Sequence, residues 1–409
     1  MHNVKKISYT KFIIALLIPF LITGPFIPDL IVSLSSLIFL VYVFKDKLFL
    51  YFTKKPSILF FIFCAYCISL SIFVAKDILL SFESSLFYFR IAVFSSLIWY
   101  LLEQDKKILN YFYYALVISF SALIVDGYIQ FFIKTNDPRV PQMRISSFFG
   151  DELIMGSYLS RLFSLLFALF IVKEKKKLEL YFMSLFFLLL SGLILISGER
   201  AAIFFYVLSF IFIIIFMKGY TKLRIVLSVC SLILMIIIIL SFDQVKNRMQ
   251  ILAARTITKS IFTQHHDSLI RTAYNMFLDK PIVGHGPKMF RIICKDEKYA
   301  TGTMPCTTHP HNFYVQLLAE TGIIGFGFLL SAFAYVLYCA YRQFKSIALR
   351  QKRYLTDYQV CLLAGILITV WPITTNGNFF HNWLMIAYSL PVGFYLHSIY
   401  GKNRENISF

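Results

Sequence analysis

The sequence predicts an all-α, polytopic membrane protein with about twelve transmembrane helices and one long extramembrane loop that itself contains helices. Three observations lead to this fold class. Hydrophobic residues make up 58% of the 409 residues and charged residues only 15%, a composition that excludes an ordinary soluble domain. Most apolar runs are about 17–25 residues long, which is enough to cross a hydrocarbon core of about 30 Å. Lysine and arginine lie in short clusters between these runs.

The predicted helices follow from the positions of the apolar runs. The first run, in "MHNVKKISYTKFIIALLIPFLITG", resembles a signal peptide. It lacks a small-x-small cleavage site and further apolar runs follow it, so we interpret it as an uncleaved membrane helix. The predicted helices cover residues 11–28, 30–44, 57–75, 82–101, 109–131, 150–172, 179–197, 201–217, 225–242, 313–341, 357–373 and 383–400.

The distribution of positive charge orients these helices. If the N-terminus is cytoplasmic, most lysines and arginines fall on the inner side, because the outer connections apart from the long loop carry only Lys76, Lys134, Arg139, Arg144 and Arg200. Positive residues are retained in the cytoplasm during insertion, so both termini are expected there. The same distribution explains the net charge of +19 as a topology signal, and we expect no nucleic-acid partner.

The chain is therefore expected to have three parts. Residues 1–242 form the first nine transmembrane helices, residues 243–312 form a loop domain on the outer face, and residues 313–409 form the last three helices and a cytoplasmic tail. In the loop, "DSLIRTAYNMFLDKP" predicts a helix that Asp267 caps and that ends before Pro281. A long ordered loop of this kind is more often functional than a plain connection.

A histidine begins the tenth predicted helix, in "HPHNFYVQLLAETGIIGF". Because this helix runs from outside to inside, His311 lies at its positive N-terminal end, which disfavours imidazolium and leaves a neutral ring that can accept a proton. Asn312 can orient that ring or a substrate. Gly322 and Gly325 lie on nearly the same helix face and are expected to let a neighbouring helix pack closely. The alternative is an interfacial histidine beside ordinary packing glycines.

Several arginines are candidates for an anion site. Arg200, in "SGERAA", follows the turn between two helices, where backbone N–H groups and a guanidinium converge; the alternative is a snorkelling side chain paired with Glu199. Arg271 in the loop helix is a second candidate, although an isolated arginine there is usually solvated. The remaining candidates lie within or beside predicted membrane helices, where a charge is functional by default, and are Arg90, Arg161 and Arg144.

The alternative for these membrane arginines is a structural ion pair, with Asp126 and Glu83 as the possible partners. No metal site is expected, because His265, His266, His285 and His309 lack metal-ligand spacing. No phosphate-loop or dinucleotide motif occurs, so no nucleotide cofactor is expected either. Cys294 and Cys306 lie in the same loop and either form a disulfide or remain two free thiols.

The order of three stretches, "SGERAA", "RTAYNMFLDKPIVGHGPKMF" and "HPHNFYVQLLAETGIIGF", resembles the O-antigen ligase and O-antigen polymerase superfamily of the bacterial envelope. Its characteristic pattern, His-Asn followed after nine residues by Gly-x-x-Gly, is matched by His311, Asn312, Gly322 and Gly325. The resemblance implies a glycosyltransferase of the inner membrane with its active site facing the periplasm. It also implies a glycan donor on undecaprenyl diphosphate.

The resemblance further implies an acceptor, which is the lipid A core for a ligase or a growing glycan for a polymerase. His311 corresponds to the catalytic histidine of the family, and Arg200 and Arg271 to its functional arginines, with Arg144 and Arg161 as less direct matches. Transfer would be metal-independent and would invert the anomeric carbon. A flippase for lipid-linked oligosaccharides is the rival class, and a structural envelope protein without chemistry is the third.

Overall fold

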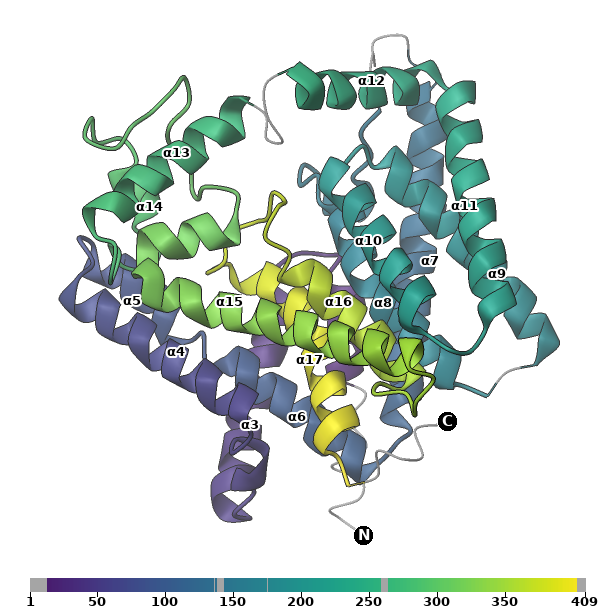
Figure 1. The fold of residues 1–409 in the computed structure, drawn as a ribbon, viewed down its shortest axis with the longest axis horizontal. Coiled ribbons are helices and arrows are strands. Elements are labelled where there is room, and N and C mark those ends of the chain that lie inside the picture. Colours follow the sequence, from purple (N-terminus) through teal and green to yellow (C-terminus); the bar gives the residue numbers. More distant parts are fainter. Residues whose placement is uncertain (1–12, 136, 138–142, 175, 259–263, 403–409) are drawn as a thin grey trace.

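The computed structural model describes residues 13–135, 137, 143–174, 176–258 and 264–402. These residues form helices and their connections, without a strand among them, so the predicted all-α fold class is confirmed. Eight helices in the described part are long and apolar enough to cross a membrane. The protein is therefore a polytopic membrane protein (Figure 1).

Each predicted segment from 30–44 onward has a helical counterpart, although the count of twelve membrane helices is not confirmed. The spans that are long enough are α3 (Phe26–Lys45), α4 (Lys55–Phe73), α5 with α6 (Ile78–Leu86 and Arg90–Gln104), α7 (Ile108–Thr135), α8 (Met155–Val172), α9 (Lys177–Ile196), α11 (Thr221–Ser241) and α15 (Phe313–Ala348). The other apolar segments form α10 (Arg200–Phe216), α16 (Asp357–Thr369) and α17 (Asn382–Tyr400).

The first predicted helix, residues 11–28, differs most from the prediction. Its described residues form short helical stretches, among them α2 (Leu17–Phe20), and the next helix begins at Phe26. Gly24 has a φ of 139° and Pro25 follows it, and this pair interrupts the helix because only glycine readily adopts that φ and proline lacks an N–H. Arg139, residues 1–12 and the tail beyond residue 402 lie outside the described part.

Helix α8 lies at the centre of the bundle. It packs against α7, α9, α10, α16 and α17, and most of its side chains are fully buried. Figure 1 shows α8, α10, α16 and α17 in the middle, with α3, α4 and α5 to one side and α7, α9 and α11 to the other. On α11 the exposed side chains are mostly isoleucine, leucine and valine, as expected for a helix that faces lipid.

Residues 243–258 and 264–312 fold onto one end of the bundle, which we call the loop face. They form α12 (Asp243–Thr258), α13 (Gln264–Asp279) and the short α14 (Phe290–Ile293). In Figure 1, α12 crosses the top of the bundle and α13 and α14 lie to the left of it. The predicted cap at Asp267 was wrong, because α13 already includes Gln264 and Asp267 lies within its first turn. An acidic residue still stabilises that turn through the helix dipole.

The loop has a hydrophobic cluster of its own, separate from the main core. Its buried members are Leu269, Ala273, Met276, Met289, Phe290, Ile293, Cys294, Tyr299 and Ala319. Ala319 belongs to α15, so this cluster joins the loop to the first turns of that helix. Cys294 and Cys306 form a disulfide with a Cα–Cα distance of 5.0 Å, which answers the question that the sequence left open.

Helix α15 is broken at Gly322, which has a φ of 65° and a ψ of −168°. The chain segment from Pro281 to Gly286 fills the break: Ile323 N–H donates to the Pro281 carbonyl at 2.9 Å, and Gly286 N–H donates to the Glu320 carbonyl at 2.8 Å. A Cβ at Gly322 would collide with the Ile282 carbonyl. The glycine therefore admits a crossing loop, whereas the sequence analysis expected a neighbouring helix.

The disulfide should stabilise the loop measurably. Replacing Cys294 and Cys306 by serine opens a short closed loop, and the loop-entropy model assigns such a closure about 3 kcal/mol. We expect a lower midpoint of thermal unfolding for the double variant, and the same decrease when the wild-type protein is treated with a reductant. Cys230→Ser, at a half-buried free cysteine, is the control. An unchanged midpoint, or alkylation of both cysteines without reductant, would contradict the bridge.

Candidate functional site

His311 lies in the turn that leads into α15, with its backbone in the left-handed region at a φ of 57°. Its carbonyl accepts a hydrogen bond from Asn376 N–H at 2.8 Å. A non-glycine residue adopts this conformation only when its surroundings hold it there, and such positions are frequent in functional sites. The fold thus fixes the backbone of the residue that the sequence pattern singled out.

Four histidines gather at this place and form the histidine cluster, defined as His265, His266, His309 and His311. The ring centroid of His311 lies 4.1 Å from that of His309, 5.2 Å from that of His266 and 6.4 Å from that of His265. Two segments supply the cluster, because His265 and His266 come from the first turn of α13. His265, His266 and His309 were considered from the sequence only as metal ligands that their spacing disfavours, and their contact with His311 was not predicted.

Three members of the cluster, His266, His309 and His311, have lowered pKa values. Burial lowers the pKa of His311, and His265 lowers it further. Burial also lowers the pKa of His266 to about 4, with His311, His265 and Arg200 acting in the same direction, and that of His309 to about 3. At neutral pH these three imidazoles are therefore uncharged and can accept a proton. The pKa values are lowered by burial and by repulsion between neighbouring rings. The sequence had suggested the helix dipole as the reason for a neutral His311.

The turn at "SGERAA" ties two helices together. Gly198 has a φ of 67°, and the Glu199 carboxylate accepts hydrogen bonds from Gly156 N–H at 2.6 Å and from Ser157 N–H and Oγ at 3.2 and 2.6 Å. Glu199 thus caps the first turn of α8. Burial raises the pKa of this carboxyl to about 7, while these hydrogen bonds and Arg144 lower it. Three hydrogen bonds to the start of α8 therefore position the Glu199 carboxylate.

Three arginines surround this turn and form the arginine cluster, defined as Arg144, Arg200 and Arg248. Arg248 donates from its guanidinium to the Gly198 carbonyl at 3.1 and 3.0 Å, and Arg144 acts electrostatically on Glu199. Arg200 begins α10 and acts electrostatically on His266. The arginine cluster therefore borders the histidine cluster.

Arg248 was missed by the sequence analysis because its helix, α12, was not predicted. The signal that could have found it is the polar helical pattern of residues 243–258 directly after an apolar span.

Arg271 is paired within its own helix. It is on α13 with 66% of its side chain exposed, and its Nε donates to Asp267 at 2.8 Å. This pair joins residues four apart on one helix, and such exposed pairs contribute little to stability. The structure thus brings Arg200 to the histidine cluster and leaves Arg271 on the exposed side of α13.

Arg161 lies inside the helical bundle and is linked to the site through Asn376. Its side chain is 2% exposed, and one of its terminal nitrogens donates to Asn376 Oδ1 at 2.7 Å. Its guanidinium carbon lies 3.8 Å from the ring centroid of Tyr388 and 4.4 Å from that of Phe205. An amide and two aromatic faces therefore compensate this buried charge, where the sequence analysis looked for an acid. Asn376 in turn holds the His311 carbonyl.

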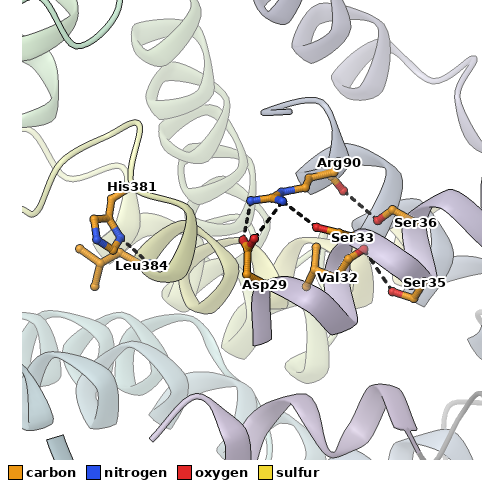
Figure 2. Close-up of polar contacts among 8 residues, drawn as sticks. All are labelled: Asp29, Val32, Ser33, Ser35, Ser36, Arg90, His381 and Leu384. Carbon is orange, nitrogen blue, oxygen red and sulfur yellow. Dashed lines mark hydrogen bonds and ion pairs between the residues drawn. The ribbon is translucent and has the colours of Figure 1, made fainter. Parts of the chain in front are cut away.

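Arg90 forms a structural ion pair, and its predicted partners were wrong. Its guanidinium donates to the two Asp29 carboxylate oxygens at 2.5 and 3.2 Å and to Ser33 Oγ at 2.6 Å (Figure 2). Asp126 instead accepts from Ser147 Oγ at 2.6 Å and from Gln130. Asp29 was overlooked because the predicted helix boundary fell between residues 28 and 30. This pair fastens α3 to α6.

Asn312 is the N-cap of α15. Its Oδ1 accepts from Tyr314 and Val315 N–H at 3.0 and 3.1 Å. Its Nδ2 donates to the carbonyls of Pro372 and Thr374 at 2.8 and 3.2 Å. With 3% of the residue exposed, the side chain is fully used inside the protein. Asn312 therefore positions the start of the helix against the segment that carries Asn376.

The arrangement offers a neutral base, a set of positive charges and a helix N-terminus at one end of a membrane bundle. In the described part of the chain, no three histidine, cysteine, aspartate or glutamate side chains are placed to hold a metal ion. The chemistry that these residues can perform is proton abstraction beside a stabilised anion.

Fold and site together define a polytopic membrane protein with a cationic, histidine-bearing site at one end of its helical bundle. The O-antigen ligase family model matches residues 185–330, and this match supports membership of the chain in the O-antigen ligase and polymerase superfamily. Enzymes of this family are glycosyltransferase-like and act in glycan assembly, which implies lipid-linked glycan substrates. No curated protein matches the chain. The matched range contains Arg200, Arg248, His266 and His311.

Proposed function

We propose that the protein is an O-antigen ligase, a metal-independent inverting glycosyltransferase that moves a glycan from undecaprenyl diphosphate to the lipid A core oligosaccharide. The reaction would take place at the periplasmic face of the bacterial inner membrane, with both termini of the chain in the cytoplasm. One observation carries the proposal: the His266 ring lies 5.2 Å from the ring of a neutral His311, and the charge of Arg200 acts on the same His266.

The arginine cluster suits the diphosphate of the donor. Arginine presents a planar fork that matches paired phosphate oxygens, and Arg200 does so at the N-terminus of α10, where backbone N–H groups also favour an anion. When the bond between the sugar and the diphosphate breaks, the leaving group gains negative charge. Fixed positive groups in a site of low dielectric stabilise that charge strongly. Arg271 would join them by exchanging the Asp267 carboxylate for a phosphate.

His311 suits the role of general base. The acceptor hydroxyl loses its proton to a neutral ring nitrogen of His311 while its oxygen attacks the anomeric carbon. The bond from that carbon to the phosphate oxygen breaks on the opposite side, so the configuration at the anomeric carbon inverts. The proton then leaves His311 for solvent, and the diphosphate departs as an anion. The bond energy of the sugar diphosphate drives the transfer, so no nucleotide is needed at this face.

Three further residues, Arg161, Asn376 and Asn312, support this mechanism through position. Arg161 holds the Asn376 side chain, and Asn376 N–H holds the His311 carbonyl at 2.8 Å. Asn312 fastens the start of α15 to Pro372 and Thr374. A base must lie within hydrogen-bond reach of the proton that it accepts, so these contacts bear on the rate without touching a substrate. A flippase would bind the same lipid without needing a fixed base.

One reaction tests the proposal and distinguishes a ligase from a polymerase, the closest alternative. Purified protein in lipid bilayers is mixed with an undecaprenyl-diphosphate glycan and with lipid A that carries a core oligosaccharide. We expect the glycan to appear on the lipid A core. Elongation of the lipid-linked glycan instead would identify a polymerase, which could use the same base and diphosphate site. Movement of the donor across the bilayer without transfer would identify a flippase.

Removal of divalent metal should leave the transfer intact. The proposed mechanism stabilises the diphosphate with arginines, so EDTA in excess over contaminating metal is expected to change the initial rate less than about twofold. The control is the same assay with added Mg²⁺. Loss of activity in EDTA that Mg²⁺ or Mn²⁺ restores would contradict this mechanism.

The orientation in the membrane can be measured with single cysteines in a background without the free cysteines Cys64, Cys67, Cys230, Cys339 and Cys361. Lys280→Cys lies at the exposed end of α13 and Lys176→Cys in the exposed connection before α9. The positive-inside rule predicts that an impermeant thiol reagent added to intact spheroplasts modifies the first and spares the second. The reverse pattern would place the loop face in the cytoplasm and contradict the proposed localisation.

A further inference from the structure

A cavity of about 360 Å³ opens between the start of α3, the segment before α8 and the start of α17. Its volume lies in the range of small-molecule sites, which measure about 300–1,000 Å³. The side chains that matter for its chemistry are Phe148, Phe149, Trp383, Glu152, His381 and Thr23. None of the residues assigned above to catalysis or to the diphosphate lines this cavity.

An aromatic wall gives the cavity its shape. The ring centroids of Phe149 and Trp383 lie 6.0 Å apart, and Phe149 packs in turn on Tyr158 at 5.5 Å. Trp383 Nε1 donates to the Leu21 carbonyl at 3.1 Å, which fixes the orientation of the indole. Phe148 is half-exposed beside them, at 54%. A fixed aromatic face is suited to a flat, rigid partner with C–H groups on one side.

Three polar side chains accompany this wall: Glu152, His381 and Thr23, whose hydroxyl already donates to the Phe20 carbonyl at 3.0 Å. His381 caps α17, because its Nδ1 accepts from Leu384 N–H at 3.4 Å (Figure 2). A neutral ring with an accepting Nδ1 carries its proton on Nε2, so that nitrogen is a donor. The exposed Glu152 carboxylate is an acceptor. The cavity thus combines an aromatic face with one donor and one acceptor, which matches the C–H face and the hydroxyl groups of a sugar ring.

The charges in the lining disfavour the diphosphate in this cavity. The lining contains the Glu152 carboxylate and no lysine or arginine, so a phosphate there would lie beside a like charge without a guanidinium or ammonium group in the lining to bind it. A polyprenyl chain is also a poor match, because it would desolvate Glu152 and His381 without offering them a hydrogen bond. A neutral, hydroxyl-bearing ring satisfies both the apolar and the polar groups.

The position of the cavity favours the acceptor sugar as its ligand over the donor sugar. The segment from Asn376 to His381 joins it to the site, because Asn376 N–H binds the His311 carbonyl and His381 acts electrostatically on His309. In an inverting displacement the acceptor approaches opposite the leaving diphosphate. The arginine cluster, which is the proposed diphosphate site, does not line this cavity. The cavity is therefore available to the acceptor glycan, whose hydroxyl attacks the anomeric carbon.

We propose that this cavity binds a sugar ring of the acceptor glycan, stacked on Trp383 and hydrogen bonded to Glu152 and His381. This inference rests on the proposed glycosyltransferase function. It applies to a lipid A core and to a growing lipid-linked glycan alike, because both present sugar hydroxyls. The terminal ring of the acceptor would be held here while its hydroxyl reaches His311.

Kinetics with the full-length protein in bilayers test the proposal. Trp383→Leu and Glu152→Gln should each raise the acceptor KM about tenfold, which corresponds to about 1.4 kcal/mol, and should leave kcat and the donor KM unchanged. Asp151→Asn, at the neighbouring exposed acid that does not line the cavity, is the matched control. Two series, one with lipid A core and one with a lipid-linked glycan, show which acceptor is used. An unchanged acceptor KM in both variants overturns the proposal.

A binding measurement keeps the proposal testable without catalysis. Core oligosaccharide freed from lipid A is added to the detergent-solubilised protein, and saturation transfer to its sugar protons is recorded by NMR. We expect transfer with the wild type and its loss with Trp383→Leu, at an unchanged midpoint of thermal unfolding. If the oligosaccharide binds but no glycan is transferred, the proposed function is refuted and the sugar site in the cavity is supported. If glycan is transferred and Trp383→Leu has no effect, the proposed function is supported and the sugar site is refuted.

Discussion

Replacing His311 by alanine is expected to reduce glycan transfer by about 10²–10⁴-fold, the usual contribution of a general base. His311 is the residue whose backbone Asn376 holds and whose pKa burial lowers, so its loss removes the proton acceptor and leaves the arginine cluster in place. Donor binding should persist. The measurements are the initial rate of transfer and the affinity for the lipid-linked donor.

A second variant separates the chemistry from folding. His311 has a φ of 57°, and asparagine tolerates this left-handed conformation better than alanine does. His311→Asn should therefore keep the turn and the wild-type unfolding midpoint while losing as much activity as His311→Ala. If either variant retains more than about a tenth of the wild-type rate, His311 is not the general base.

The pH dependence gives the same assignment an independent signature. A base must be unprotonated to act, and burial places the pKa of His311 below its ordinary value of 6.5. The wild-type kcat/KM should therefore be flat around neutral pH and should fall only as the pH drops below 6.5. The residual activity of His311→Asn should lack this acidic limb. An acidic limb centred above pH 7 in the wild type would point to another group.

Arg200→Lys is expected to lower kcat/KM for the donor by about 10²-fold, although it keeps the positive charge. A lysine supplies a single point charge, whereas the arginine fork binds two phosphate oxygens in a defined geometry. The removal of one such donor from a developing anion typically costs about 10²–10³-fold in rate. The measurement is kcat/KM for the undecaprenyl-diphosphate glycan at fixed acceptor concentration.

The matched control is Arg342→Lys. Arg342 lies near the other end of α15, exposed, and donates to Tyr338 Oη at 2.7 Å. This substitution should leave transfer unchanged. If Arg200→Lys also retains wild-type activity at an unchanged unfolding midpoint, Arg200 is a snorkelling side chain and the diphosphate site lies elsewhere. Arg248→Lys, tested beside it, shows whether the arginine cluster acts as a unit.

Much of the site was predictable because its signals are local. His311 precedes a long apolar run and Arg200 follows a turn between two apolar runs, so hydropathy placed both residues at helix ends. Gly322 and Gly325 belonged to a recognisable pattern, but the reason for Gly322 was wrong. Its role depends on the Pro281–Gly286 segment entering the break in α15, and that contact joins residues far apart in the chain.

Residues that complete the site carried no comparable signal. His266 and Arg248 reach it from α13 and α12, two helices whose mutual placement hydropathy does not report. In the sequence, Arg161 and Arg90 are both charges within membrane helices that need a compensating partner. The structure gives them chemically different partners. Arg161 binds an amide on the segment after α16, whereas Arg90 binds Asp29 on α3. Only packing distinguishes a positioning arginine from a structural ion pair.

The sequence by itself determined the all-α membrane architecture, the ends of most helices and the two motif residues His311 and Arg200. These features depend on how each stretch of chain partitions between lipid and water, which is a property of local composition. The tertiary structure decided which distant groups share one site: four imidazoles, three arginines and a cavity lined by Trp383 and Glu152. Their chemistry depends on burial and on contacts across the bundle, because a pKa and a binding geometry follow from neighbours that only the folded chain brings together.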